Sequence, residues 1–215
     1  MNKPITLVTG ASRGIGREVC VQLAAKGHHI VALARTVGAL EELADAVGDE
    51  NITLIPQDLN DGKALESLGP LLFEKFGRVN NFVANAGLLG TLSPLHQADP
   101  AQWNQVFQVN VIANLHLIRT LHPLLTQSVD AHAIFVTSSV AKNPRAFWGA
   151  YAASKAALEN MVEGYAQETE GKIKVSIFDP GGTATRMRAS AFPGEDPKTL
   201  PSASETAARL VKLFD

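Results

Sequence analysis

Residues 5–16 have the sequence ITLVTGASRGIG. Residues 5–8 predict a short buried strand, and the apolar periodicity that continues to about Gly27 predicts a helix directly after the turn. Gly10, Gly14 and Gly16 lie in this turn, where glycine lets the backbone approach a pyrophosphate and the start of the helix presents amides to an anion. The favoured interpretation is a nucleotide-binding loop, and the alternative is a glycine-rich turn without a ligand.

After this stretch the chain alternates between strand and helix. Apolar segments that predict further strands cover 30–34, 52–56, 79–84, 133–137 and 174–178. Helical patterns lie between these strands at 37–47, at 102–125 and at 151–170, and another helix follows the strand 52–56 and ends at about residue 76. A last helix is predicted at 203–214. Because most of the strands lack polar alternation, they predict a parallel sheet covered on both faces. The expected fold class is therefore α/β, a Rossmann-type doubly wound sheet in three layers.

Length, charge and cysteine content limit the possible functions. The length of 215 residues predicts one domain, 1–215, and the net charge of −2 gives no electrostatic reason to bind nucleic acid or an anionic membrane. Cys20 is the only cysteine, so we expect no internal disulfide, a reducing cytoplasmic environment and a buried role for this residue.

Other classes of protein also lack support in the sequence. No apolar run approaches the ~20 residues of a membrane span, and the first strand begins too early to leave room for a signal peptide. The six histidines show no ligand spacing with cysteine or acidic residues, so we expect no metal site.

A second stretch, Tyr151-Ala152-Ala153-Ser154-Lys155, carries the candidate chemistry. On a helix, Tyr151 and Lys155 lie one turn apart on the same face. A phenol has a pKa of about 10, and a neighbouring ammonium favours the phenolate. We therefore expect Lys155 to lower the pKa of Tyr151 and to enable proton transfer with a substrate oxygen. A solvated Tyr–Lys pair is the alternative.

The spacing G-x-x-x-G-x-G, the turn Asn85-Ala86-Gly87 and the pair Tyr151-x-x-x-Lys155 together resemble the short-chain dehydrogenase/reductase family. The resemblance covers residues 5 to about 185. It implies an oxidoreductase that transfers a hydride between NADP(H) or NAD(H) and a carbonyl or alcohol substrate. Two alternatives stay open, a catalytically weak NADP-binding regulatory protein on the same fold and a nucleotide-sugar epimerase or dehydratase. The latter would need a further substrate domain.

The resemblance also implies roles for individual residues. Tyr151 matches the proton donor, Lys155 the lysine that orients the nicotinamide ribose, and Asn110 the asparagine that holds a water in the proton relay. The remaining implied cofactor contacts are Thr9, Gly10, Ser12, Gly14, Ile15 and Gly16 of the loop, Asp58 and Leu59 at the adenine, Asn85, Ala86 and Gly87 at the adenosine ribose, and Pro180, Gly181, Thr183 and Thr185 at the nicotinamide.

The serine that would hold the substrate carbonyl is one of two neighbours, Ser138 and Ser139. The local pattern Ser-Ser-Val-Ala favours Ser139, whereas the family's usual interval to Tyr151 favours Ser138. Lys142 stands where this pattern usually has a glycine, so the loop is altered. Ser139 is narrowly preferred, and a turn or capping role is expected for the other serine.

The end of the second strand bears on the choice of cofactor. An NAD site usually has an acid there, which accepts a hydrogen bond from the ribose 2′-hydroxyl. The segment Ala32-Leu33-Ala34-Arg35-Thr36 has no carboxylate. Arg35 and Arg13 could instead flank a 2′-phosphate, so we expect NADP(H). The alternative is that both arginines belong to the solvated surface.

Near the expected substrate site, apolar and basic residues are mixed, and they identify no substrate. They are Phe147, Trp148, Arg186, Met187, Arg188 and Phe192.

The carboxyl-terminal part of the chain bears on assembly. The family usually adds a seventh strand after the last helix, and here we expect none, so that the sheet ends at 174–178 with an unpaired edge. We expect a homodimer through the helices 102–125 and 151–170, which is the family's other dimer axis. Small residues would suit such helix packing but would equally suit packing against the sheet; they are Ala153, Ala156, Ala157 and Asn160.

Overall fold

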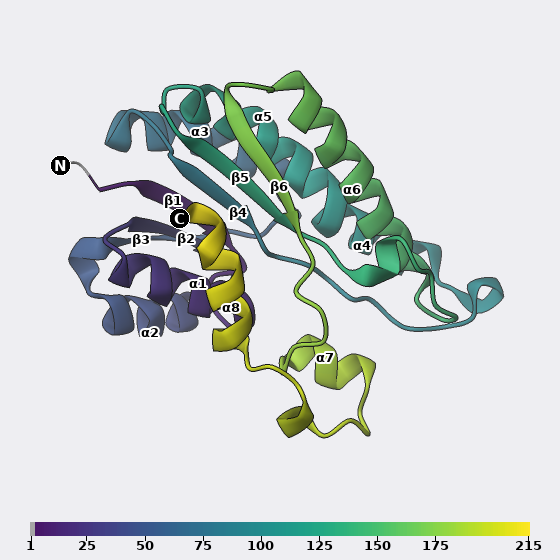
Figure 1. Cartoon of the computed structure of the whole chain (residues 1–215). Coiled ribbons are helices and arrows are strands. Elements are labelled where there is room, and N and C mark those ends of the chain that lie inside the picture. Colours follow the sequence, from purple (N-terminus) through teal and green to yellow (C-terminus); the bar gives the residue numbers. More distant parts are fainter. Residues whose placement is uncertain (1–2) are drawn as a thin grey trace.

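Residues 3–215, which the computed structural model describes, contain one parallel sheet with the strand order β3-β2-β1-β4-β5-β6 (Figure 1). The order reverses between β1 and β4, which is the switch point where doubly wound sheets bind ligands. The strands are β1 (Ile5–Thr9), β2 (His29–Ala34), β3 (Ile52–Pro56), β4 (Asn81–Ala84), β5 (Ala131–Val136) and β6 (Ile173–Phe178).

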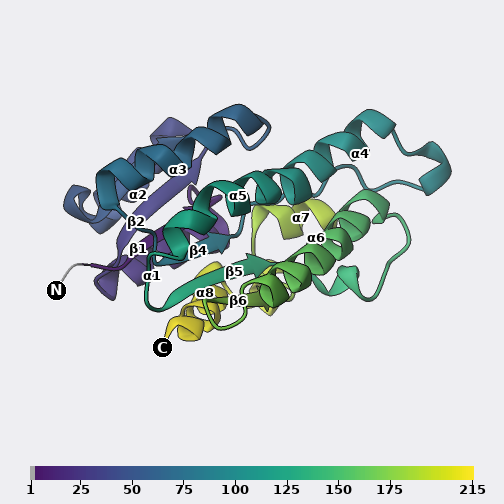
Figure 2. The same cartoon turned by 90° about the horizontal axis from the view of Figure 1, so that it is seen from above.

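Helices cover both faces of the sheet, which confirms the three layers (Figure 2). Successive strand residues point to opposite faces, so Leu7 belongs to one apolar cluster and Val8 to the other. One face carries α3 (Gly62–Phe76), α5 (Ala113–Leu125) and α6 (Gly149–Glu168). The other carries α1 (Gly14–Ala25), α2 (Val37–Val47) and α8 (Ala203–Val211).

The predicted helix 102–125 is interrupted in the structure. It consists of α4 (Pro100–Phe107), a π-helical turn (Gln108–Ile112) and α5. A π-helical turn accommodates an extra residue and changes the face on which the following side chains lie. Asn110 lies in this turn and is fully buried. The prediction of one continuous helix was therefore wrong here, because apolar periodicity does not reveal a single inserted residue.

The remaining differences concern the ends of elements. β4 begins two residues later and β5 two residues earlier than predicted, and α8 is followed by a 3₁₀ turn at Lys212–Phe214. A short helix, α7 (Arg186–Ala191), forms between the predicted strand 174–178 and the predicted helix 203–214, where no helix was expected. The Thr185 hydroxyl caps it by accepting a hydrogen bond from the Arg188 N–H.

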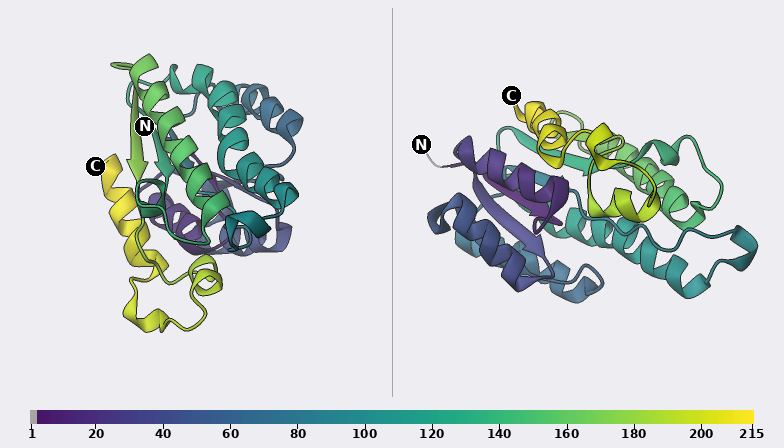
Figure 3. Two further views of the ribbon diagram at one scale, coloured as in Figure 1. Left: turned by 90° about the vertical axis from the view of Figure 1, so that its right-hand side faces the viewer. Right: turned by 90° about the horizontal axis from the view of Figure 1, so that it is seen from below.

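The last helix lies beside the first, α8 against α1 (Figure 3). Gln22 on α1 donates a hydrogen bond to the Ser204 carbonyl at 2.9 Å. Within residues 3–215 no strand follows β6, as predicted, so β6 and β3 form the two edges of the sheet. Among the same residues, no helix has the length and apolar character needed to cross a membrane.

The contact between α3 and α5 provides a test of the packing. A Cβ on Gly69 would meet the Thr120 carbonyl oxygen and hydroxyl, each at 2.5 Å. Gly69→Ala should therefore lower the free energy of unfolding by about 1–3 kcal/mol through overpacking, as measured by urea unfolding. Gly38→Ala on α2 is the control, because a Cβ there meets nothing within 4 Å. Equal effects of the two substitutions would contradict the described helix contact.

Candidate active site

The carboxyl end of β5 and the first turns of α6 form the centre of the site. The Lys155 ammonium donates a hydrogen bond to the Val136 carbonyl at 2.8 Å, and the side chain is 2% exposed. Tyr151 lies one turn earlier on α6, with its ring centre 5.8 Å from the Lys155 nitrogen. Tyr151 is also buried, at 7% exposed. Since both side chains are buried, they are not a solvated surface pair.

Of the two neighbouring serines, Ser138 lies beside Tyr151. A side-chain hydrogen bond from Ser138 acts on the Tyr151 hydroxyl. Ser139 is exposed and begins the 3₁₀ turn Ser139–Ala141, where its carbonyl accepts a hydrogen bond from the Asn143 N–H at 3.0 Å. The position of Ser138 agrees with the family's interval to Tyr151, whereas the local pattern favours Ser139, and the identity of the catalytic serine stays a prediction.

Burial dominates the proton affinity of both catalytic candidates. It raises the pKa of Tyr151 to about 12, an effect that the Ser138 hydrogen bond partly offsets and the charge of Asp179 reinforces. Burial lowers the pKa of Lys155 to about 8, while the charge of Glu159 acts in the opposite direction. The expected lowering of the Tyr151 pKa is therefore not met, because burial disfavours the charged phenolate and is the largest effect on this group.

Asn110 connects the segment after β4 to α6. Its side-chain oxygen accepts from the Leu88 N–H at 2.8 Å, and its amide nitrogen donates to the Leu88 carbonyl at 3.0 Å and the Ser154 hydroxyl at 2.9 Å. The Ser154 hydroxyl in turn donates to the Tyr151 carbonyl at 2.8 Å. The π-helical turn places Asn110 at this junction. Asn114, which sequence reasoning missed, donates to the Asn110 carbonyl at 2.9 Å.

The glycine loop is fastened to the turn after β4. A Cβ on Gly16 would lie 2.3 Å from the Gly10 carbonyl oxygen and 2.4 Å from the Asn85 side-chain nitrogen, so only glycine fits. That Asn85 nitrogen donates to the Thr9 carbonyl at 3.0 Å. The Thr9 hydroxyl accepts from the N–H groups of Asn85 and Ala86 at 3.1 and 3.0 Å. These contacts bring the loop and the turn together at the switch point of the sheet.

The surroundings of this loop suit an anionic dinucleotide. Within the described residues, the first turn of α1 has no acidic residue and no side chain caps the helix start, so its amides can meet an anion. Arg13 and Arg35 are both exposed close to the ends of β1 and β2. The guanidinium of Arg35 lies 4.0 Å from the Asp58 carboxylate, and both side chains are accessible to solvent. A phosphate could therefore approach either arginine.

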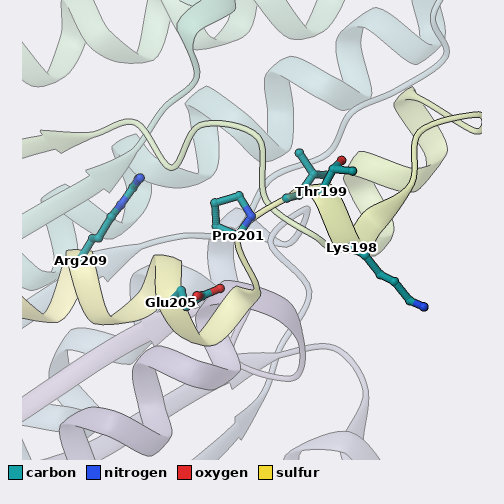
Figure 4. A pocket seen from close by; sticks show the side chains of 6 residues that line it. Lys198, Thr199, Pro201, Glu205 and Arg209 are labelled. Carbon is teal, nitrogen blue, oxygen red and sulfur yellow. The ribbon is translucent and has the colours of Figure 1, made fainter.

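The Pro180–Thr185 segment, predicted to lie at the nicotinamide, is anchored by α8. Arg209 donates to the carbonyls of Asp179 and Pro180, and the Thr183 and Thr206 hydroxyls are 3.0 Å apart. Sequence reasoning missed both α8 residues, since neither belongs to a motif. A pocket lies beside this anchor (Figure 4), lined by Lys198, Thr199, Leu200, Pro201, Glu205 and Arg209. Its lining includes no residue of the Tyr151 centre.

An aromatic wall adjoins Tyr151. The ring of Trp148 is 6.0 Å from that of Tyr151 and 5.5 Å from that of Phe192. Val140, Leu89 and Met187 belong to the same apolar cluster. The predicted pocket residues Phe147 and Arg186 are exposed, and Arg188 binds Glu195 through two hydrogen bonds of 2.5 and 2.6 Å.

Comparison with known proteins decides the family. The family described as short chain dehydrogenase matches residues 4–196 of this chain. The chain belongs to the short-chain dehydrogenase family. It is accordingly an oxidoreductase of that family, as the motifs around Gly10 and Tyr151 predict.

Three similar proteins extend this result. The uncharacterized oxidoreductase YciK of Escherichia coli K12 is 38% identical over 219 residues, which cover 100% of this chain and 85% of that protein. A short-chain dehydrogenase structure from Salmonella enterica serovar Typhi superposes with a TM-score of 0.92 at 37% identity, covering 99% of this chain and 88% of that one. A short-chain dehydrogenase from Escherichia coli CFT073, complexed with NADPH, superposes with a TM-score of 0.90 at 38% identity. The superposition covers 100% of this chain and 90% of that one.

Proposed function

We propose that this short-chain dehydrogenase transfers a hydride between NADP(H) and a carbonyl or alcohol substrate, with Tyr151 as the proton donor. The observation that carries the proposal is the group formed by the half-buried Ser138 and the buried Tyr151 and Lys155 beside the glycine loop. Two hydroxyls and an ammonium come together there next to a loop shaped for a pyrophosphate. A purely structural Tyr–Lys pair would not need that loop.

Residues of this chain would hold the cofactor at both ends. The glycine loop and the start of α1 would bind the pyrophosphate, and Arg13 and Arg35 the 2′-phosphate. Lys155 would hold the nicotinamide ribose. The similar protein complexed with NADPH supports NADP(H) over NAD(H). When bound, the cofactor supplies the hydride. The other contacts proposed for it are Thr9, Ser12, Ile15, Asp58, Leu59, Asn85, Ala86, Gly87, Pro180, Gly181, Thr183 and Thr185.

The catalytic side chains manage the substrate oxygen and its proton. Ser138 donates a hydrogen bond to the substrate carbonyl, and Tyr151 gives its proton to the oxygen as negative charge develops there. Lys155 stabilises the phenolate that remains. Asn110 keeps the start of α6 in position and holds the water through which the proton is replaced. Because the pKa of Tyr151 is about 12, its hydroxyl is protonated at neutral pH, which suits carbonyl reduction.

A regulatory protein that only binds NADP is the alternative function. The cofactor loop would serve such a protein, which would have no use for the Tyr151 hydroxyl as an acid beside Ser138. The hydride-transfer function uses both parts of the site. A cytoplasmic location is part of the same proposal, since Cys20 is buried and unpaired and NADP(H) is an intracellular cofactor.

Replacing Tyr151 separates chemistry from cofactor binding. Tyr151→Phe keeps the ring and removes the transferable proton, so turnover should fall by ~10²-fold or more while NADPH still binds. Lys155→Ala should reduce both turnover and the binding of NADPH. The measurements are NADPH oxidation with a panel of aldehydes and ketones, and NADPH fluorescence on binding. Near-normal turnover by Tyr151→Phe would rule out its role as the acid.

The two serines provide a matched pair of substitutions. Ser138→Ala removes a hydrogen bond to the reacting oxygen and should lower kcat by about 10²-fold. Ser139→Ala changes an exposed turn residue and should leave kcat within about twofold, because surface changes have small effects. If steady-state kinetics show that Ser139→Ala lowers kcat more than Ser138→Ala does, Ser139 is the catalytic serine instead.

Arg35 should determine the preference for NADPH over NADH. Loss of a charge-assisted hydrogen bond costs about 1.5–3 kcal/mol, so Arg35→Ala should lower the ratio of the two kcat/KM values by about 10- to 100-fold. Arg78→Ala is the control, since Arg78 precedes β4 at the opposite end of the strands. A wild-type protein that uses NADH as well as NADPH would contradict the assignment.

The α5 and α6 surface is proposed as a homodimer interface. Leu115 is 42% exposed on α5, and Ala156 and Asn160 are exposed on α6 rather than packed against the sheet. Light scattering should show a dimer, and Leu115→Arg should make it a monomer because it places a charge in an apolar contact. Leu71→Arg on α3, at a residue 60% exposed, should leave the dimer intact. A stable tetramer would contradict this assembly.

A further inference from the structure

Glu159 on α6 has no part in the mechanism proposed above. It is 7% exposed, although a carboxylate is costly to bury unless it is paired and hydrogen-bonded. It lies one turn after Lys155, as Lys155 lies one turn after Tyr151. The three side chains therefore share one face of the helix.

Two consecutive residues at the end of β5 bind two consecutive turns of this face. The Val136 carbonyl accepts the hydrogen bond from Lys155 at 2.8 Å, and the Thr137 hydroxyl donates to one Glu159 oxygen at 2.7 Å. The other Glu159 oxygen lies 3.8 Å from the ammonium of Lys142. Charges of alternating sign thus run inward from Lys142 through Glu159 to Lys155.

We propose that Glu159 is a positioning residue for proton transfer, whose carboxylate keeps Lys155 charged while Thr137 holds that carboxylate in place. The kinetic consequence rests on the function proposed above. The electrostatic consequence does not, because it concerns the protonation of Lys155 in the protein by itself.

The energetics of burial support this role. A fully buried lysine without a charge partner has a pKa of about 5–6 and would be largely neutral at physiological pH. The pKa of Lys155 falls only to about 8, and the charge of Glu159 is what opposes the effect of burial. A neutral Lys155 would lose its attraction for the phenolate of Tyr151. Glu159 therefore keeps the ammonium form available at neutral pH.

The other groups near this pair contribute less. Lys142 follows the Ser139–Ala141 turn and its side chain is 72% exposed, so solvent screens its charge. Asp179, after β6, acts on Tyr151. Asn110 and Asn114, on the side of the π-helical turn, are uncharged. Glu159 is thus the acid that acts on Lys155 from within the helix.

Glu159→Gln tests the charge alone. Glutamine has nearly the same shape and can still accept the Thr137 hydrogen bond. In protein labelled with ¹³C-lysine, the NMR titration midpoint of the Lys155 Cε should move to lower pH by about 1–2 pH units. The ammonium is the active form below that midpoint, so the alkaline limb of kcat/KM for NADPH oxidation should move to lower pH by the same amount.

Two further variants isolate the effect. Glu163→Gln makes the same change one turn later on α6, at an exposed residue, and should leave both midpoints within about 0.3 pH units of wild type. Glu159→Asp keeps the negative charge, so the titration midpoint of Lys155 should stay close to that of the wild type. A folded Glu159→Gln protein with an unchanged Lys155 titration would overturn the proposal and leave Glu159 only a structural anchor.

The wild-type titration covers the remaining cases. If Glu159→Gln does not fold, a wild-type midpoint near 8 supports the proposal, and a midpoint of about 6 or below overturns it. If wild-type protein neither binds NADPH nor reduces any carbonyl compound, the proposed function fails. The Lys155 titration then still decides the role of Glu159.

Discussion

The hydrogen bond from the Lys155 ammonium to the Val136 carbonyl fixes how α6 lies against the end of β5. It buries a charge at the place where the sheet and the helix meet, and a buried donor of this kind is costly to leave unpaired. Tyr151 is one turn away on the same helix, and Ser138 is two residues beyond Val136. Their meeting follows from this one contact and the geometry of a helix and a strand.

Two other constraints bring the rest of the site to this junction. The π-helical turn points Asn110 at Leu88 and Ser154, which joins the segment after β4 to the start of α6. The Asn85 side chain binds the glycine loop at the switch point, and the absence of a side chain at Gly16 allows this close contact. The order of the strands places the glycine loop and the Asn110 junction together at the carboxyl ends of β1, β4 and β5. The glycine loop and the residues proposed for proton transfer are therefore neighbours in space although far apart in sequence.

Local patterns predicted the elements well, because apolar periodicity and glycine position report directly on backbone conformation. The strand–turn–helix at Gly10, the alternation of strands and helices along the chain and the pairing of Tyr151 with Lys155 could all be inferred in this way. The π-helical turn could not, since one inserted residue leaves the apolar pattern of 102–125 almost unchanged. Choosing between Ser138 and Ser139 needed the position of α6, and the pKa of Tyr151 needed its burial. Glu159 and Arg209 act through tertiary contacts, which no local motif encodes.

The most direct test of the account follows the hydride itself. The protein would be incubated with NADPH carrying deuterium at both positions of nicotinamide C4 and with a ketone or aldehyde that it reduces, and the alcohol analysed by NMR. The account predicts deuterium on the carbinol carbon, delivered to one face, and formation of this labelled alcohol at least ~10²-fold more slowly by the Tyr151→Phe protein. Oxidation of NADPH without deuterium in the product would contradict hydride transfer at the Ser138–Tyr151–Lys155 site.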